Sequence, residues 1–158
     1  MEKIDVNEIN FHTFLEKHSN DYVIIVTRSW NYQTHKGYYL YVTCMEHKYI
    51  KRKRNLLNLK SSNVGMLYGI IDACNHIKGS NAKIYLIVPT ELGFQKALKQ
   101  KGVNFSLIKE ILDLCDSKHL LLFPITFLNG GKYIKQLVSQ KSELFPGDPI
   151  CSVNFPLK

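Results

Sequence analysis

Few residues of this 158-residue chain have the types and spacing that catalysis requires. Asp113 and Asp116 lie three residues apart on a predicted helix, but aspartates usually face solvent, so we interpret the pair as a solvated face. Ser29 and Ser139 lack the flanking glycines of a nucleophile elbow. Gly130-Gly131 precedes a predicted helix, although two glycines without the rest of a phosphate-binding loop indicate little. The six histidines are scattered, with no metal-ligand spacing. These residues therefore predict neither an enzyme nor a metal or cofactor site.

The cysteines also favour a structural role. No two of them form a Cys-x-x-Cys pair, and they are Cys44, Cys74, Cys115 and Cys151. Such spacing does not favour a zinc site. The first residues, 1–5, mix charges and lack the apolar core of a secretory signal, so we expect a cytoplasmic protein, with the nucleus as the alternative compartment. Because disulfides are rare there, the cysteines are predicted to be reduced thiols in the core.

The densest charge feature is Lys51-Arg52-Lys53-Arg54, which lies on a predicted strand. One interpretation is a sheet edge that charge protects from aggregation. A second is a ridge that contacts phosphates, and a third is a nuclear localisation signal. Because alternate residues of a strand face opposite sides, Lys51 and Lys53 share one face, and Arg52 and Arg54 share the other. A continuous patch of all four is therefore not expected.

The composition is that of a globular protein with an excess of positive charge. Hydrophobic residues make up 45% of the chain and charged residues 22%, and the length suits a single domain, 1–158. No apolar run approaches the roughly 20 residues that cross a bilayer, so no membrane partner is expected. The net charge of +8 permits binding to DNA, RNA or an acidic protein, but it does not require such a partner.

Hydrophobic periodicity predicts a helix, then three strands, then alternating helices and strands. The first helix covers about residues 7–18, with Asn7 as its cap. Three strands at 22–29, 37–45 and about 49–59 have short connections and predict an antiparallel meander. The later elements are a helix from Asn63 to a stop at Gly79, a strand at 83–89, a short helix at about 90–100, a helix capped by Asn104, a strand at 119–128, a helix at 132–141 and an extended tail at 142–158.

Five short sequence words, in order, resemble those of type 1 ribonuclease H over a core of about residues 22–140. The family's Thr-Asp-Gly-Ser and Gly-Gly-Tyr-Gly correspond to Val26-Thr27-Arg28-Ser29 and Lys36-Gly37-Tyr38-Tyr39. The opening of its first core helix, its Thr-Asp-Ser after strand four and its final helix resemble 61–67, 88–90 and 131–138. The resemblance implies an α/β, ribonuclease H-like fold with an extra N-terminal helix. Its five-stranded mixed sheet would have the order 3-2-1-4-5, with the first three strands antiparallel and helices on both faces.

The departures from that family decide the expected chemistry. The family uses four carboxylates to hold two Mg²⁺ ions, which activate a water and stabilise the leaving oxygen of the cleaved phosphate. In this alignment the four positions hold Arg28, Met66, Pro89 and Lys135, none of which can ligate a hard cation. The resemblance therefore implies a catalytically inactive domain that holds no metal.

Two functions fit an inactive domain of this kind. Arg28 lies where the family's metals meet the phosphate, so Arg28 and Lys135 can hold a phosphate without cutting it. Alternatively, the pocket has collapsed around Met66 and Pro89. The first hypothesis is a nucleic-acid-binding or scaffolding module, on DNA, RNA or a hybrid. Its candidate contacts are Arg28, Lys51, Arg52, Lys53, Arg54 and Lys135. The second is a protein-interaction module (a subunit, adaptor or inhibitor) that uses the fold as a rigid platform.

Overall fold

The structure is a computed structural model of the chain, and it describes residues 2–5, 8–46, 48–78, 81–89, 92–94, 97, 99–128 and 154–156. Strands and helices alternate after an opening series of strands, close to the predicted pattern. The elements are β1 (Glu2–Asp5), α1 (Glu8–Lys17), β2 (Tyr22–Asn31), β3 (Lys36–Met45), β4 (Lys48–Leu57), α2 (Ser62–Asn75), β5 (Lys83–Val88), α4 (Phe105–Ser117), β6 (Leu121–Leu128) and β7 (Asn154–Pro156).

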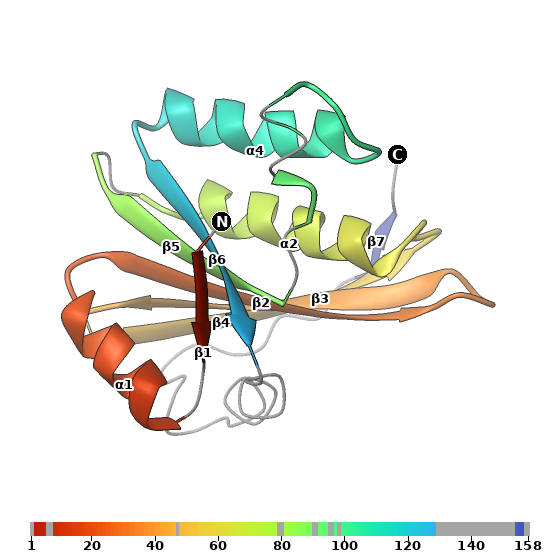
Figure 1. Cartoon of the computed structure of the whole chain (residues 1–158). Helices are drawn as coiled ribbons and strands as arrows, with labels where there is room; N and C mark the ends of the chain where they lie inside the picture. The colour runs from red at the N-terminus through yellow and green to blue at the C-terminus, as the bar shows by residue number, and fades with distance from the viewer. Residues whose placement is uncertain are drawn as a thin grey trace.

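All of these strands form one sheet, in the order β1-β6-β5-β2-β3-β4-β7. β2, β3 and β4 are antiparallel neighbours, β5 is parallel to β2, and β6 is parallel to β5. The predicted strands one to five are β2, β3, β4, β5 and β6. The order β4-β3-β2-β5-β6 is therefore the predicted order 3-2-1-4-5, and the α/β fold is confirmed. α2 and α4 cover one face of the sheet, and α1 lies on the other (Figure 1).

The sequence does not predict the two outermost strands. β1 pairs with Ile125–Leu128 of β6, and β7 pairs with Asn55–Leu57 of β4. The prediction that the third strand forms the sheet edge is therefore wrong for 55–57. Both added strands are too short to show a period of two, and their pairing is visible only in the fold. The predicted helix at 132–141 lies outside the described residues, as do parts of the predicted helix at 90–100 and most of the tail.

The middle of β2 is buried on both faces. Each residue of Val23–Val26 is at most 1% exposed, as expected of a central strand that is covered from both sides. Ile24 belongs to the hydrophobic core beneath α2 and α4. On the opposite face, Phe14 of α1 and His18, which follows α1, pack against Tyr85 of β5, with ring centroids 5.7 and 4.0 Å from that of Tyr85, respectively. β2 is therefore fixed in the centre of the molecule.

α2 lies close to the sheet, and its first turn is capped. It begins one residue before its predicted start, and the Ser61 Oγ accepts a hydrogen bond from the Val64 N–H at 3.2 Å. Gly69 faces β3, where an added Cβ would lie 3.1 Å from the Tyr39 side chain. A larger residue at this position would therefore push the helix away from the sheet.

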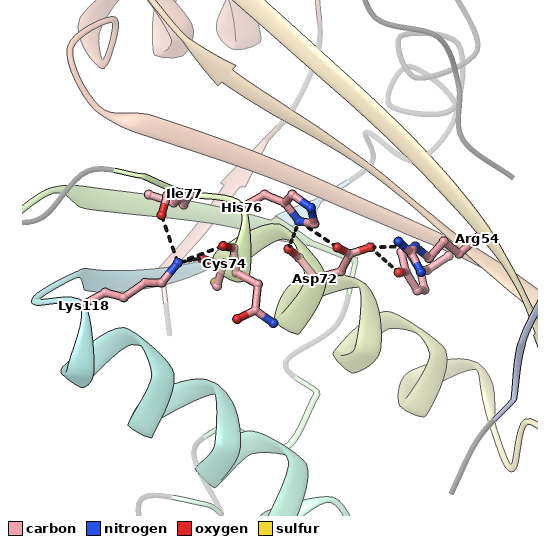
Figure 2. A network of polar contacts seen from close by, with 8 residues as sticks. Arg54, Asp72, Cys74, His76, Ile77 and Lys118 are labelled. Carbon is pink, nitrogen blue, oxygen red and sulfur yellow. Dashed lines mark hydrogen bonds and ion pairs between the residues drawn. The ribbon is translucent and has the colours of Figure 1, made fainter. Parts of the chain in front are cut away.

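The other end of α2 is held by a lysine from the end of α4. The Lys118 Nζ donates hydrogen bonds to the carbonyl oxygens of Cys74, Asn75 and Ile77 at 3.0, 2.9 and 3.0 Å (Figure 2). The last carbonyls of a helix have no partner within it, and a cation there also complements the helix dipole. α2 ends at Asn75, before the predicted stop at Gly79, which lies outside the described residues.

The predicted burial of the cysteines is confirmed for Cys44, Cys74 and Cys115, and Cys151 lies outside the described residues. Cys74 of α2 and Cys115 of α4 meet in the core, with their Sγ atoms 4.0 Å apart. Burial raises the pKa of the Cys44 thiol to about 12. Asn104 occupies the predicted N-cap position of α4, but its side chain makes no capping hydrogen bond.

Replacing Lys118 by Met should lower the free energy of unfolding by about 1–3 kcal/mol, because three carbonyls, two of them partly buried, lose a charged donor. Urea unfolding of the two proteins measures this difference. The matched control is Lys109→Met, which removes an exposed ion pair with Asp113 and should change stability by less than about 0.5 kcal/mol. Equal losses in the two variants would show that the Lys118 contacts do not stabilise the end of α2.

Candidate nucleic-acid interface

Most of the net positive charge of the chain lies in the segment that forms the antiparallel strands of the sheet, β2, β3 and β4. From Tyr22 to Ile71 the chain contains eight Lys or Arg residues and one acidic residue, Glu46, so this segment carries seven of the eight net positive charges. It forms β2, β3, β4 and most of α2. We call residues 22–71 the basic segment. A charge count by segment, rather than for the whole chain, would have revealed it from the sequence.

Strand register places three arginines on the face beneath α2. Arg28 lies opposite Tyr39, which lies opposite Arg54, and Arg52 is two residues before Arg54 on β4. Directly opposed residues point to the same face of a sheet, and Tyr39 packs against Gly69 of α2. Arg28, Arg52 and Arg54 therefore share the α2 face.

The other two cations of the Lys51–Arg54 run face the opposite side, as predicted. Lys51 is only 4% exposed, so it lies in the interior rather than on a surface that phosphates reach. The Lys53 Nζ lies 4.3 Å from the centre of the Tyr38 ring, in a cation–π contact. These placements do not form the exposed ridge that one interpretation of the run requires.

The carboxylate of Asp72 on α2 forms hydrogen bonds and ion pairs with residues of the basic segment and with His76 (Figure 2). The Tyr39 hydroxyl donates a hydrogen bond to its Oδ2, and the Arg54 Nε lies 3.3 Å from the same oxygen. The His76 Nδ1 lies 2.9 Å from the Asp72 Oδ1 and 2.8 Å from its backbone oxygen. Burial, with the hydrogen bond and the negative charge of Asp72, raises the pKa of Tyr39 far above its usual range, so its hydroxyl remains a donor.

Three of the four positions that the resemblance aligns with the family's carboxylates lie among the described residues. Met66 is 0% exposed and belongs to the core, which agrees with a filled rather than an open pocket at that position. Arg28 is half-buried, and Pro89 directly follows β5. Lys135 lies outside the described residues, so its proposed approach to Arg28 stays a prediction.

A second group of cations lies where the β2–β3 hairpin meets the loop before α2. The Trp30 Nε1 donates to the Leu59 carbonyl oxygen at 2.8 Å, and the Leu59 N–H donates to the His35 carbonyl oxygen at 2.7 Å. These bonds fix the hairpin against the loop and place the exposed Lys36 and Lys60 at the same end of the sheet. We call this region, residues 30–36 and 58–60, the hairpin end. Neither lysine is among the candidate nucleic-acid contacts predicted from the sequence, because neither lies in a run of charge.

A groove lies at the opposite end of the same face. It has a volume of about 500 Å³ and is bounded by β2, β3, β4, the last turn of α2 and the residues that follow it. Its lining includes Tyr41, Met45, Ile50, Arg52, His76 and Lys78. We call it the α2 groove. Its residues come from positions that are far apart in the sequence, so no local motif predicts it.

Comparisons with known proteins do not assign the chain to a family: no family model matches it, and no curated protein matches it either. Within the described part of the chain, no three His, Cys, Asp or Glu side chains are grouped as metal ligands would be. No helix among the described residues is long and apolar enough to cross a membrane.

We expect no cleavage of an RNA–DNA hybrid in the presence of Mg²⁺ or Mn²⁺, because the side chains of Arg28, Met66 and Pro89 offer no hard-cation ligand. A labelled hybrid incubated with purified protein and either metal measures this, with an active ribonuclease H as the positive control. Metal-dependent cutting that is lost when Arg28 or Pro89 is substituted would contradict the expectation.

Proposed function

We propose that this chain is a catalytically inactive ribonuclease H-like domain that binds DNA, RNA or a hybrid through its phosphates. The observation that carries the proposal is the charge of the basic segment, which holds nearly all of the net positive charge in one half of the sheet. Clustered Lys and Arg on one side of a domain are the usual electrostatic footprint of a nucleic-acid-binding surface.

The hairpin end supplies the most accessible contacts. Lys36 and Lys60 are exposed, and Tyr32 at the hairpin tip is exposed as well. Lysines of this kind contact phosphates without reading sequence, and an exposed tyrosine offers a ring on which a base can stack. Because hydrogen bonds to Leu59 already fix the hairpin and the loop, binding requires little ordering of the backbone.

The interior cations have a different role in this proposal. Arg54 is held by Asp72, and Lys51 is buried, so neither is placed to contact a phosphate. Arg28 is half-buried beside the hairpin end on the α2 face, and no hydrogen bond or ion pair joins its side chain to another residue in the part of the chain that the structure describes. It is therefore the best candidate for an additional phosphate contact.

Changing Lys36 and Lys60 to Ala together should weaken binding to a short hybrid or duplex and reduce the salt slope of log K by about two, roughly one for each lost phosphate contact. Fluorescence of Trp30, the only tryptophan, reports binding directly, because its indole is hydrogen-bonded next to Lys60. Folding should be unaffected, since exposed cations contribute little to stability.

The matched control is the change of Lys99 and Lys101 to Ala. Both lysines are exposed and lie outside the basic segment, so this variant has the same net charge as the test variant. Its salt slope should remain close to that of the wild type. If the two double variants behave alike, the binding surface is not the hairpin end, and absence of salt-sensitive binding in the wild type would refute the proposal itself.

The alternative function, a protein-interaction module, is favoured by one observation. Leu121 and Phe123 of β6 are 57% and 40% exposed, and the Phe123 ring stacks on Tyr85 at 5.4 Å. Exposed apolar side chains that lie together are typical of contact surfaces. A partner that stays bound after nuclease treatment, and is lost on changing Phe123 to Ser, would support this function instead.

A further inference from the structure

The α2 groove combines an apolar floor with a cationic rim. Tyr41 and Met45 come from β3 and Ile50 from β4, and all three point to the α2 face. Arg52 lies beside them on β4, and the segment that follows α2 adds His76, its C-cap, and Lys78. Its volume of about 500 Å³ is within the usual range for sites that bind small organic molecules.

The orientation of His76 leaves one ring nitrogen for a ligand. Its Nδ1 lies within hydrogen-bonding distance of two oxygens of Asp72, a carboxylate oxygen and a backbone carbonyl. Both oxygens are acceptors, so the hydrogen must be on Nδ1. The Nε2 of the neutral ring is therefore an acceptor, which suits a hydrogen-bond donor of a ligand.

The charges that line the groove favour an anion. Arg52 and Lys78 are cationic, and Glu46 is the one acidic residue among the described lining residues. The carboxylate of Asp72 does not face the groove as a free charge, because Tyr39, Arg54 and His76 already bind it. The carbonyls at the end of α2, which would repel an anion, are bound by Lys118.

We propose that the α2 groove binds a nucleoside phosphate. The base packs on Met45 and Ile50, above the buried Tyr41. The phosphate is held by Arg52 and Lys78, and the Nε2 of His76 accepts a hydrogen bond from a donor of the nucleoside. The carboxylate of Glu46 accepts a hydrogen bond from a sugar hydroxyl or an exocyclic amino group of the ligand, because an ionised carboxylate is only an acceptor.

This site is separate from the hairpin end. Tyr22, at the start of β2, lines the groove, whereas the hairpin follows Asn31, at the end of β2. Ten extended residues place the two regions roughly 30 Å apart. If the bound nucleotide is part of a nucleic-acid strand, the α2 groove is a second contact surface of the proposed function and rests on it. A free nucleotide can occupy the groove even if the hairpin end binds no polymer.

The test measures binding of AMP, GMP, CMP and UMP to the full chain by calorimetry and by amide chemical shifts. At least one nucleotide should bind with a Kd of about 1 mM or lower and shift the amides of Met45, Ile50 and His76. Ile50→Glu, at a position that is 41% exposed, places a negative charge in the groove and should weaken binding about tenfold. Val103→Glu is the matched control at a fully exposed position away from the groove, and it should leave binding unchanged.

Two further variants separate the outcomes. Lys78→Ala changes an exposed residue and should also weaken binding. It replaces Ile50→Glu as the test variant if Ile50→Glu does not fold. The variant with both Lys36 and Lys60 changed to Ala should bind the mononucleotide as the wild type does. If it loses binding to the polymer alone, the hairpin end binds the polymer and the α2 groove still binds the nucleotide. Equal effects of Ile50→Glu and Val103→Glu, or no binding of any mononucleotide, would overturn it.

The ligand's parts and its source are tested with the same protein. Inorganic phosphate and adenosine should each bind more weakly than AMP, and phosphate that binds as tightly as AMP would overturn the assignment of a base site. Competition by an oligonucleotide with a 5′-phosphate, but not by one without it, would identify a strand end as the ligand. Competition by neither would identify a free nucleotide.

Discussion

The carboxylate of Asp72 offsets part of the positive charge of the basic segment. It is the only acidic residue between Glu46 and Glu91, in a stretch that also contains the Lys51–Arg54 run. Tyr39 donates to it, and Arg54 and His76 lie within ion-pair distance. Partly buried cations need a counter-charge, and Asp72 supplies one on the helix that covers them. The remaining positive charge is therefore left for the surface.

α2 connects the two candidate sites because each of its ends has a different neighbour. Its start, capped by Ser61, follows the loop that hydrogen bonds fix against the β2–β3 hairpin. Its end is held by Lys118 and forms one wall of the α2 groove. Close approach at Gly69 holds the helix against β3 between these ends. The geometry of both sites therefore depends on the packing of a single helix.

The central sheet is predictable from the sequence because its strands carry strong local signals. The apolar run at Val23–Val26 and the short connections of β2, β3 and β4 predict a meander, and the later alternation of helix and strand predicts the parallel half. β1 and β7 have no such signal, since four and three residues cannot show a period. Their positions depend on pairing with β6 and β4, which are distant in the sequence.

The candidate site is less predictable than the fold. Alternation along β4 gives the faces of Lys51 and Arg52 correctly, but it cannot reveal that Lys51 is buried. Exposure of Lys36 and Lys60 depends on the hairpin and on the bonds to Leu59, and the groove joins residues from Tyr22 to Lys78. The sequence contains the charge bias of the basic segment, whereas only the fold shows which cations remain on the surface.

The central claim is that the hairpin end is the surface that meets nucleic acid. An amide chemical-shift map of the isotope-labelled protein, titrated with a short RNA–DNA hybrid at low salt, tests this claim most directly. We predict that the largest shifts fall on residues 31–36 and 58–64, and that added salt reverses them. Shifts confined to residues 120–124 of the exposed apolar surface on β6, or no shifts at all, would contradict the account.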